Sequence, residues 1–108
     1  MLPRIGIIGG SGFYQMPGLE NRSEHTPATP FGPPSAPIVT GQINGVPLAF
    51  LARHGLHHTL NPSEVPYRAN LFALHELGVR TCVSITAVGS LKAELKPSEL
   101  VIPDQYID

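Results

Sequence analysis

The apolar residues of this chain fall into short runs separated by stretches rich in glycine and proline. Residues 4–9 form an apolar run bounded by glycines, which predicts a buried strand near the centre of a sheet. Residues 38–43 and 46–52 are further apolar runs, joined by Asn44-Gly45. Because Asn-Gly tolerates the positive φ values of a short hairpin turn, these runs are expected to pair as a hairpin.

A helical pattern begins after the hairpin. Residues 62–66 are expected to open the helix, with Pro66 tolerated in its first turn. Gly78 is expected to end the helix. One apolar face of the helix is expected, formed by Tyr67, Leu71, Leu74 and Leu77. Tyr67 and Phe72 are therefore predicted to lie in the core.

Further strands are predicted after the helix. Residues 79–89 are rich in β-branched and small side chains, which indicates a buried strand with Cys82 as a small apolar residue in its middle. A strand that follows a helix in this way favours parallel pairing through a right-handed crossover. Residues 100–103 are expected to form a last short strand, whereas the prolines of residues 27–37 predict a stiff covering loop.

Together these elements predict an α/β fold, a mixed and largely buried sheet of about five strands with one flanking helix. A single helix cannot cover both faces of such a sheet, so the fold is expected to be incomplete. Residues 1–108 are accordingly interpreted as the amino-terminal part of a single domain.

Composition narrows the class of protein. The net charge of −1 offers no basic stripe for nucleic acid, and no apolar run approaches the roughly 20 residues that span a bilayer. No secretory signal is visible at the start of the sequence. Cys82 is the single cysteine, so an internal disulfide is excluded and a reducing compartment is favoured. A cytoplasmic protein without a nucleic-acid or membrane partner is expected.

Polar residues follow three of the predicted strands at the point where each strand ends. Ser11 follows Gly9-Gly10, Arg53-His54 follows the second hairpin strand, and Thr86 lies late in the next strand. Ligands of open α/β sheets gather outside the carboxyl ends of strands. Hydroxyl groups and a guanidinium suit a phosphate dianion, so these strand ends are candidates for a phosphate site. The alternatives are a simple tight turn at the glycines and a Thr86 that serves only β structure.

His54, His57 and His58 are close enough in sequence to bind a metal ion together. No carboxylate or cysteine lies near them in the sequence, so a metal is the less favoured reading. His57 and His58 are interpreted as loop histidines, with a phosphate role kept for His54.

Six motifs that occur in one order resemble the amino-terminal part of the 5′-methylthioadenosine phosphorylases, within the trimeric purine nucleoside phosphorylase family. They are Gly9-Gly10-Ser11-Gly12, Thr29-Pro30-Phe31-Gly32-Pro33-Pro34-Ser35, Ala52-Arg53-His54-Gly55, Tyr67-Arg68-Ala69-Asn70, Thr86-Ala87-Val88-Gly89-Ser90 and Asp104-Gln105-Tyr106-Ile107-Asp108. Each motif is weak by itself, and the resemblance rests on their common order across nearly the whole sequence.

The resemblance implies phosphorolysis of a purine nucleoside, with 5′-methylthioadenosine as the expected substrate and a free base and methylthioribose 1-phosphate as products. It implies a role in purine and methionine salvage, a homotrimer when the protein is complete, and phosphate as a co-substrate without a metal or organic cofactor. It also implies that phosphate is bound by Ser11, Arg53, His54, Thr86 and the backbone of Ala87.

The resemblance identifies no catalytic residue here, because the family's purine-reading residues and the acid that assists base departure lie later in its chains. Three alternatives therefore stay open: a 6-oxopurine nucleoside phosphorylase, a methylthioinosine phosphorylase, and a non-catalytic phosphate-binding fragment. The 108-residue chain by itself is expected to be inactive.

Overall fold

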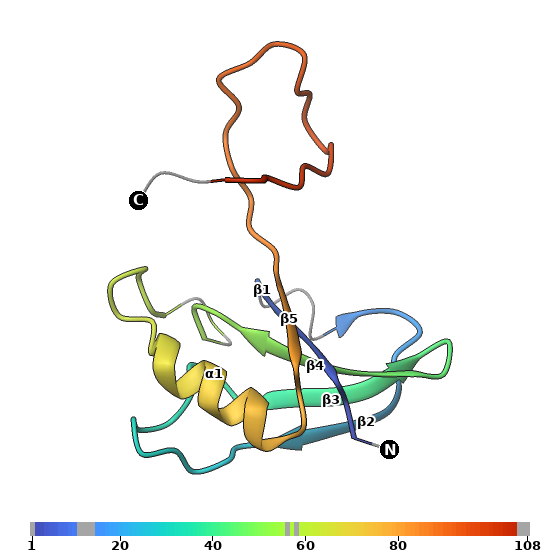
Figure 1. The fold of residues 1–108 in the computed structure, drawn as a ribbon, viewed down its shortest axis with the longest axis vertical. Helices are drawn as coiled ribbons and strands as arrows, with labels where there is room; N and C mark the ends of the chain where they lie inside the picture. Colours follow the sequence, from blue (N-terminus) through green and yellow to red (C-terminus); the bar gives the residue numbers. More distant parts are fainter. Residues whose placement is uncertain (1, 11–14, 56, 58, 106–108) are drawn as a thin grey trace.

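The computed structural model describes residues 2–10, 15–55, 57 and 59–105. Its strands form one mixed sheet in the order β2-β3-β4-β1-β5, and one helix packs against a face of that sheet (Figure 1). In chain order the elements are β1 (Ile5–Gly9), β2 (Glu20–His25), β3 (Ile38–Ile43), β4 (Val46–Ala52), α1 (Tyr67–Glu76) and β5 (Thr81–Ser84). The predicted α/β class with a mixed sheet and a flanking helix is confirmed.

Strand β1 lies between β4 and β5 and runs parallel to both. Its Ile8 is paired with Leu51 of β4 on one side and with Ser84 of β5 on the other. The carboxyl ends of these parallel strands therefore meet at one edge of the sheet. The parallel pairing predicted for the strand after the helix is confirmed.

The predicted hairpin is also confirmed. Strands β3 and β4 pair antiparallel, and the turn between them has positive φ at both Asn44 (50°) and Gly45 (79°). A turn of this kind has the twist of the flanking strands, which is why Asn-Gly is favoured there. The hairpin brings the end of β4 back beside the end of β1.

The core lies between β3, β4 and the inner face of α1. Its largest fully buried apolar side chains are Phe50, Ile38, Leu51, Leu74 and Val39. The helix lies close to β1: a Cβ placed on Gly6 would be 3.5 Å from Leu74 Cδ2 of the helix and 3.0 Å from Val79 Cγ1, just beyond it. The absence of a side chain at Gly6 thus lets the chain after α1 approach the sheet.

The prediction of the buried helix face was wrong in part. The buried residues of α1 are Ala69, Asn70, Ala73 and Leu74, whereas Tyr67 and Leu71 are each 53% exposed. Small alanine side chains face the sheet because the helix packs closely there, and the pattern of large apolar residues did not reveal them. Phe72 is half-buried rather than in the core, and its ring meets Phe31 edge-on at 6.0 Å.

The helix also begins later than predicted. The Asn61 side chain accepts hydrogen bonds from the backbone N–H groups of Ser63 (2.9 Å) and Glu64 (3.0 Å), and the Glu64 carboxylate accepts one from the Asn61 backbone N–H (2.9 Å). This reciprocal arrangement is a capping box, here closing a turn that stops before α1. Pro66 is the N-cap residue of α1.

The predicted strands outside the core required three corrections. Strand β2, which was not predicted, is a charged and almost fully exposed edge strand with an irregular register between Glu20 and Ser23. Charges and irregularities protect sheet edges, and they also hide the apolar alternation that marks a strand. The strand predicted over residues 79–89 is shorter and comprises only β5 (Thr81–Ser84), and residues 100–103 form no strand.

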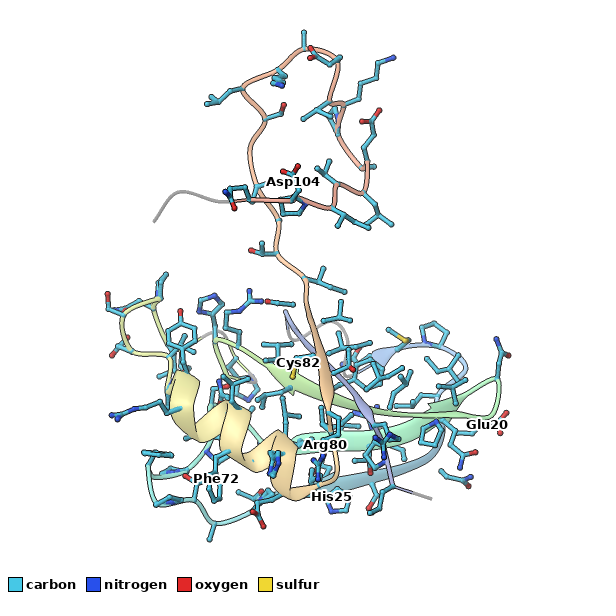
Figure 2. All side chains as sticks on the ribbon, viewed as in Figure 1. Glu20, His25, Phe72, Arg80, Cys82 and Asp104 are labelled. Atoms are coloured by element: carbon cyan, nitrogen blue, oxygen red, sulfur yellow. The ribbon has the colours of Figure 1, made fainter. Side chains whose placement is uncertain are left out.

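Every residue of β5 is exposed, so the expectation that Cys82 is buried was wrong. None of the described residues forms a second layer over β5, and residues 85–105 extend away from the sheet (Figure 1). The side chains of that segment, including Asp104, stand apart from the sheet (Figure 2). Within the described ranges, no helix has the length and apolar character needed to cross a membrane.

Candidate functional site

Arg53 lies immediately beyond β4, at the edge where the parallel strands end. Its backbone N–H donates to the Gly9 carbonyl at 2.9 Å, which continues the pairing of β4 with β1 by one residue. Its side chain reaches across the end of β1 toward β5. There Nη2 donates to Ser84 Oγ (2.6 Å), the Ile85 carbonyl (3.2 Å) and the Ile8 carbonyl (3.3 Å). One half-buried guanidinium therefore joins the ends of β4, β1 and β5.

This arrangement leaves part of the guanidinium available. Nη2 has two N–H groups, and three neutral acceptors share them. Among the described residues, Nε and the other terminal nitrogen of Arg53 have no hydrogen-bond acceptor, and no carboxylate pairs with the group. An arginine carries its charge at any physiological pH. Within the described part of the chain, the edge of the sheet therefore presents a positive charge that no carboxylate neutralises, with N–H donors, which suits an oxyanion.

His54 is fixed by the loop that follows it. Its Nδ1 lies 2.9 Å from the Leu60 carbonyl, and because a carbonyl only accepts, Nδ1 carries the proton. The Leu60 N–H donates back to the His54 carbonyl at 3.1 Å, which closes the loop. The chain changes direction at Gly55, whose φ is 86°, and a Cβ at this position would lie only 3.1 Å from Thr59 Oγ1. The imidazole is thus oriented by its hydrogen bond to the backbone of the loop.

A second set of hydrogen bonds holds the backbone just before Arg53. The Asn70 side chain of α1 is 2% exposed, and its Oδ1 accepts from the Ser35 backbone N–H at 2.8 Å. Ser35 Oγ in turn donates to the Ala52 carbonyl at 2.6 Å. Helix α1, the proline-rich loop and the end of β4 are therefore linked through polar groups. This link orients the peptide from which Arg53 extends.

The predicted phosphate-binding residues differ in where the structure places them. Arg53 and His54 lie together at the end of β4, and Arg53 reaches the end of β5. Thr86 and Ala87 lie just beyond, in the exposed segment that leaves the sheet after Ile85, whose N–H still donates to Ile8 at 2.8 Å. No hydrogen bond between described residues joins either of them to Arg53. Ser11 lies outside the described residues.

Ser84, Ser35 and Asn70 were missed as site residues. Ser84 stands inside a predicted strand, where a serine gives no signal of its partner 31 residues away. Asn70 occurs within one of the quoted motifs, but its burial follows only from the true inner face of α1. The available signal was the position of Asn70 between Ala69 and Ala73, which share the buried face of α1.

The remaining candidates give no second centre. His57 is exposed, and His58 lies outside the described residues. In the part of the chain that the structure describes, no three His, Cys, Asp or Glu side chains gather as metal ligands would. Cys82 is exposed as a residue, yet partial burial of its thiol raises the thiol pKa. The protonated thiol is a poor nucleophile at neutral pH.

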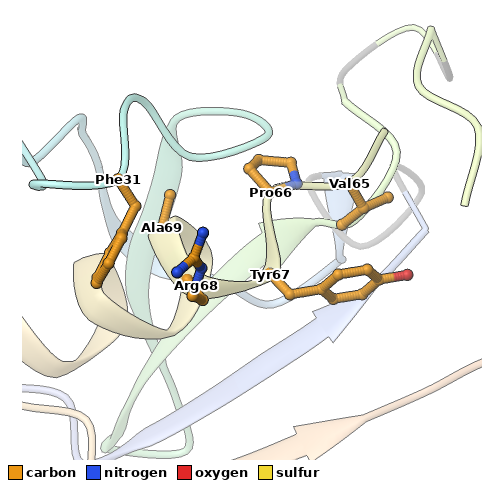
Figure 3. Close-up of a pocket in the computed structure, with 6 residues that line it drawn as sticks. All are labelled: Phe31, Val65, Pro66, Tyr67, Arg68 and Ala69. Atoms are coloured by element: carbon orange, nitrogen blue, oxygen red, sulfur yellow. The ribbon is translucent and has the colours of Figure 1, made fainter. Parts of the chain in front are cut away.

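A hollow of about 300 Å³ lies at the start of α1 (Figure 3). It shares no residue with the strand-end cluster, which consists of Arg53, His54, Ser84, Ser35 and Asn70. The guanidinium carbon of Arg68 lies 4.9 Å from the ring centre of Phe31 there, a cation–π contact. The hollow is lined by Phe31, Val65, Pro66, Tyr67, Arg68 and Ala69. Its only charged lining group is thus already engaged with a neighbouring ring.

Comparison with known proteins supports the assignment of a family. A family model described as the phosphorylase superfamily matches residues 4–108. The S-methyl-5′-thioadenosine phosphorylase of Synechocystis sp. is 57% identical over 104 residues, which are 96% of this chain and 32% of that protein. The protein of the same name from Thermococcus kodakarensis is 56% identical over 107 residues, which are 99% of this chain and 41% of that protein.

Solved structures agree with these relatives. A methylthioadenosine phosphorylase from an Antarctic soil metagenomic library superposes with a TM-score of 0.84 at 58% identity, over 89% of this chain and 33% of that one. The methylthioadenosine phosphorylase of Schistosoma mansoni without ligand gives 0.76 at 44% identity, over 88% and 34%. The chain thus spans 32% of the Synechocystis relative and 41% of the Thermococcus relative. From the match over nearly its whole length, the chain belongs to the phosphorylase superfamily.

Proposed function

We propose that this chain is the amino-terminal part of a single nucleoside phosphorylase domain whose substrate is 5′-methylthioadenosine. The observation that carries the proposal is the Arg53 guanidinium, anchored at three strand ends with N–H donors to spare. The names of the relatives, at 51% to 57% identity, support the choice of substrate.

In the proposed reaction, inorganic phosphate binds at the strand ends and its charge is met by Arg53. The bond between the purine nitrogen and the anomeric carbon of the sugar breaks, and the base leaves with the bonding electrons. The sugar acquires oxocarbenium character, which a positioned hydrogen phosphate dianion stabilises before one of its oxygens bonds to the anomeric carbon. In net terms the proton of the hydrogen phosphate passes to the purine nitrogen that leaves, so the base is released neutral and the sugar phosphate as a dianion. The products are adenine and methylthioribose 1-phosphate.

The other phosphate contacts belong to the same proposal. His54 would contact the phosphate from the end of β4, and Thr86 with the Ala87 backbone from beyond β5. Ser11, which follows β1 in the sequence and lies outside the described residues, is proposed as a further contact. Thr86 and Ala87 follow directly after Ile85, whose N–H still donates to Ile8 at the end of β1, and this adjacency supports their inclusion. No residue is proposed as the acid that assists base departure, and no metal or organic cofactor is required.

Assembly and location extend the proposal. We propose a homotrimer of the full-length phosphorylase, for which the exposed apolar side chains after β5 offer surface to cover. A cytoplasmic location is proposed from the single cysteine and the small nucleoside substrate. Neither nucleic acid nor membrane is proposed as a partner.

The test is the phosphate dependence of base release by the full-length phosphorylase. Methylthioadenosine, methylthioinosine and inosine are each incubated with the enzyme, with and without phosphate, and free base and sugar phosphate are measured. We expect adenine release from methylthioadenosine that requires phosphate and yields an equal amount of sugar phosphate. Preference for either 6-oxopurine nucleoside would change the proposed base, and no phosphate-dependent release from any of them would leave only a non-catalytic phosphate-binding protein.

A further inference from the structure

Ser84 is the last residue of β5, and its hydroxyl forms the shortest of the hydrogen bonds that hold Arg53. The Oγ atom lies 2.6 Å from Nη2, against 3.2 Å and 3.3 Å for the two carbonyls. Among these three acceptors it is the one supplied by a side chain. A substitution can therefore remove it and leave the backbone unchanged.

The position of Ser84 suits the control of a long side chain. Ser84 pairs with Ile8, which pairs on its other side with Leu51, so Arg53 must extend past the whole end of β1 to reach it. An arginine side chain loses considerable rotamer freedom when it is held in one geometry. The Ser84 hydroxyl, at the end of the extended Arg53 side chain, fixes the direction of the guanidinium. The two longer hydrogen bonds to carbonyls hold that direction less strongly.

The bond also determines which nitrogens remain for an anion. Because Ser84 and the carbonyls saturate Nη2, the donors left without an acceptor among the described residues are Nε–H and the N–H groups of the other terminal nitrogen. Without the hydroxyl, the guanidinium could rotate and present any of its nitrogens. A phosphate would then have to order the side chain when it binds, which weakens its binding.

We propose that Ser84 is a positioning residue for phosphate, acting through the Arg53 guanidinium rather than on the phosphate itself. This inference rests on the proposed function, since it assumes that Arg53 binds the phosphate co-substrate. It predicts a specific effect on phosphate, because the proposal assigns the Arg53 guanidinium to phosphate and not to the nucleoside.

The test compares Ser84→Thr with Ser84→Val in the full-length phosphorylase. Both replacements are β-branched and suit a strand, and they differ by a hydroxyl against a methyl group. We expect Ser84→Val to raise the KM for phosphate about 3- to 10-fold, the loss of one net hydrogen bond, and Ser84→Thr to restore most of it. The KM for methylthioadenosine should stay within about twofold in both variants.

Two controls separate positioning from a general effect on β5. Thr81→Val changes a residue at the other end of the same strand and should leave both KM values unchanged. In an Arg53→Ala background, Ser84→Val should add nothing further, since the group that it positions is gone.

Particular outcomes would overturn the inference. An unchanged phosphate KM in Ser84→Val, or a rise of equal size in the Arg53→Ala background, would show that Ser84 does not act through Arg53. If the unmodified enzyme needed no phosphate at all, the proposed function would fail first and this inference with it. The wild-type phosphate titration therefore distinguishes the two failures.

Discussion

At the scale of single residues, the strand-end cluster depends on side chains that hydrogen-bond to backbone far away in sequence. Asn70 reaches Ser35, and Ser35 reaches Ala52, the residue before Arg53. A buried polar group is stable only when it is paired, so these residues depend on one another. Because Asn70 is 2% exposed, water cannot readily replace its bond to the Ser35 N–H.

Replacement of Asn70 by alanine should destabilise the fold. It would leave the Ser35 backbone N–H without its acceptor, at a cost of about 1–3 kcal/mol in the free energy of unfolding. Denaturant titration followed by circular dichroism measures this. Ser23→Ala, on the exposed edge strand β2, serves as the control and should change stability by less than about 0.5 kcal/mol. Equal stability of Asn70→Ala and the wild type would show that the link is not structural.

Part of this cluster could be predicted from sequence. An apolar run that stops at Arg53-His54 locates both residues at a strand end, and the structure agrees. Ser84, Ser35 and Asn70 could not be found in this way, since their partners are 17 to 35 residues distant. Long-range side-chain bonds depend on the register of the sheet and on the helix face, and local patterns determine neither.

At the scale of elements, the predictions succeeded where local chemistry dictates structure. Asn44-Gly45 fixes the hairpin, and the order of helix and strand fixes the parallel pairing of β5 with β1. The predictions of burial failed where burial depends on how closely a neighbouring element packs. The inner face of α1 is made of small side chains because the helix sits close to the sheet, so the large apolar residues did not mark it.

The corrected face of α1 can be tested with two leucines. Leu74 is fully buried, so Leu74→Ala should lower the free energy of unfolding by about 2–5 kcal/mol. Leu71 is 53% exposed, so Leu71→Ala should lower the free energy of unfolding by less than about 1 kcal/mol, because leucine and alanine have similar helix propensities. Thermal or denaturant unfolding of both variants measures the two losses in the free energy of unfolding. Comparable losses would mean that the helix is rotated relative to the structure.

At the scale of the whole molecule, the chain is less compact than its length allows. The radius of gyration is 14.6 Å, against about 13 Å for a compact domain of this length. The difference comes from the segment after β5, where Val88, Leu91, Leu100 and Ile102 are from 81% to fully exposed. Apolar side chains gathered in one exposed segment are a surface that other protein normally covers.

The 108-residue chain alone should therefore bind a dye that reports apolar surface, associate with itself, and show no phosphorolysis. Size-exclusion chromatography, dye fluorescence and the base-release assay test these points together. Replacing Leu91, Leu100 and Ile102 by serine should reduce dye binding and association without loss of the circular dichroism signal of the sheet. A monomeric, dye-silent chain that cleaves methylthioadenosine would contradict this account.

We propose that phosphate binds where β1, β4 and β5 end, on Arg53. The direct test is a phosphate titration of the Arg53→Ala full-length enzyme at saturating methylthioadenosine. Loss of charge-assisted hydrogen bonds worth about 1.5–3 kcal/mol should raise the phosphate KM about 10- to 100-fold and leave the nucleoside KM nearly unchanged. Arg68→Ala, which removes an arginine stacked on Phe31, is the matched control and should leave the phosphate KM unchanged. An unaltered phosphate KM in Arg53→Ala would show that Arg53 does not bind the phosphate.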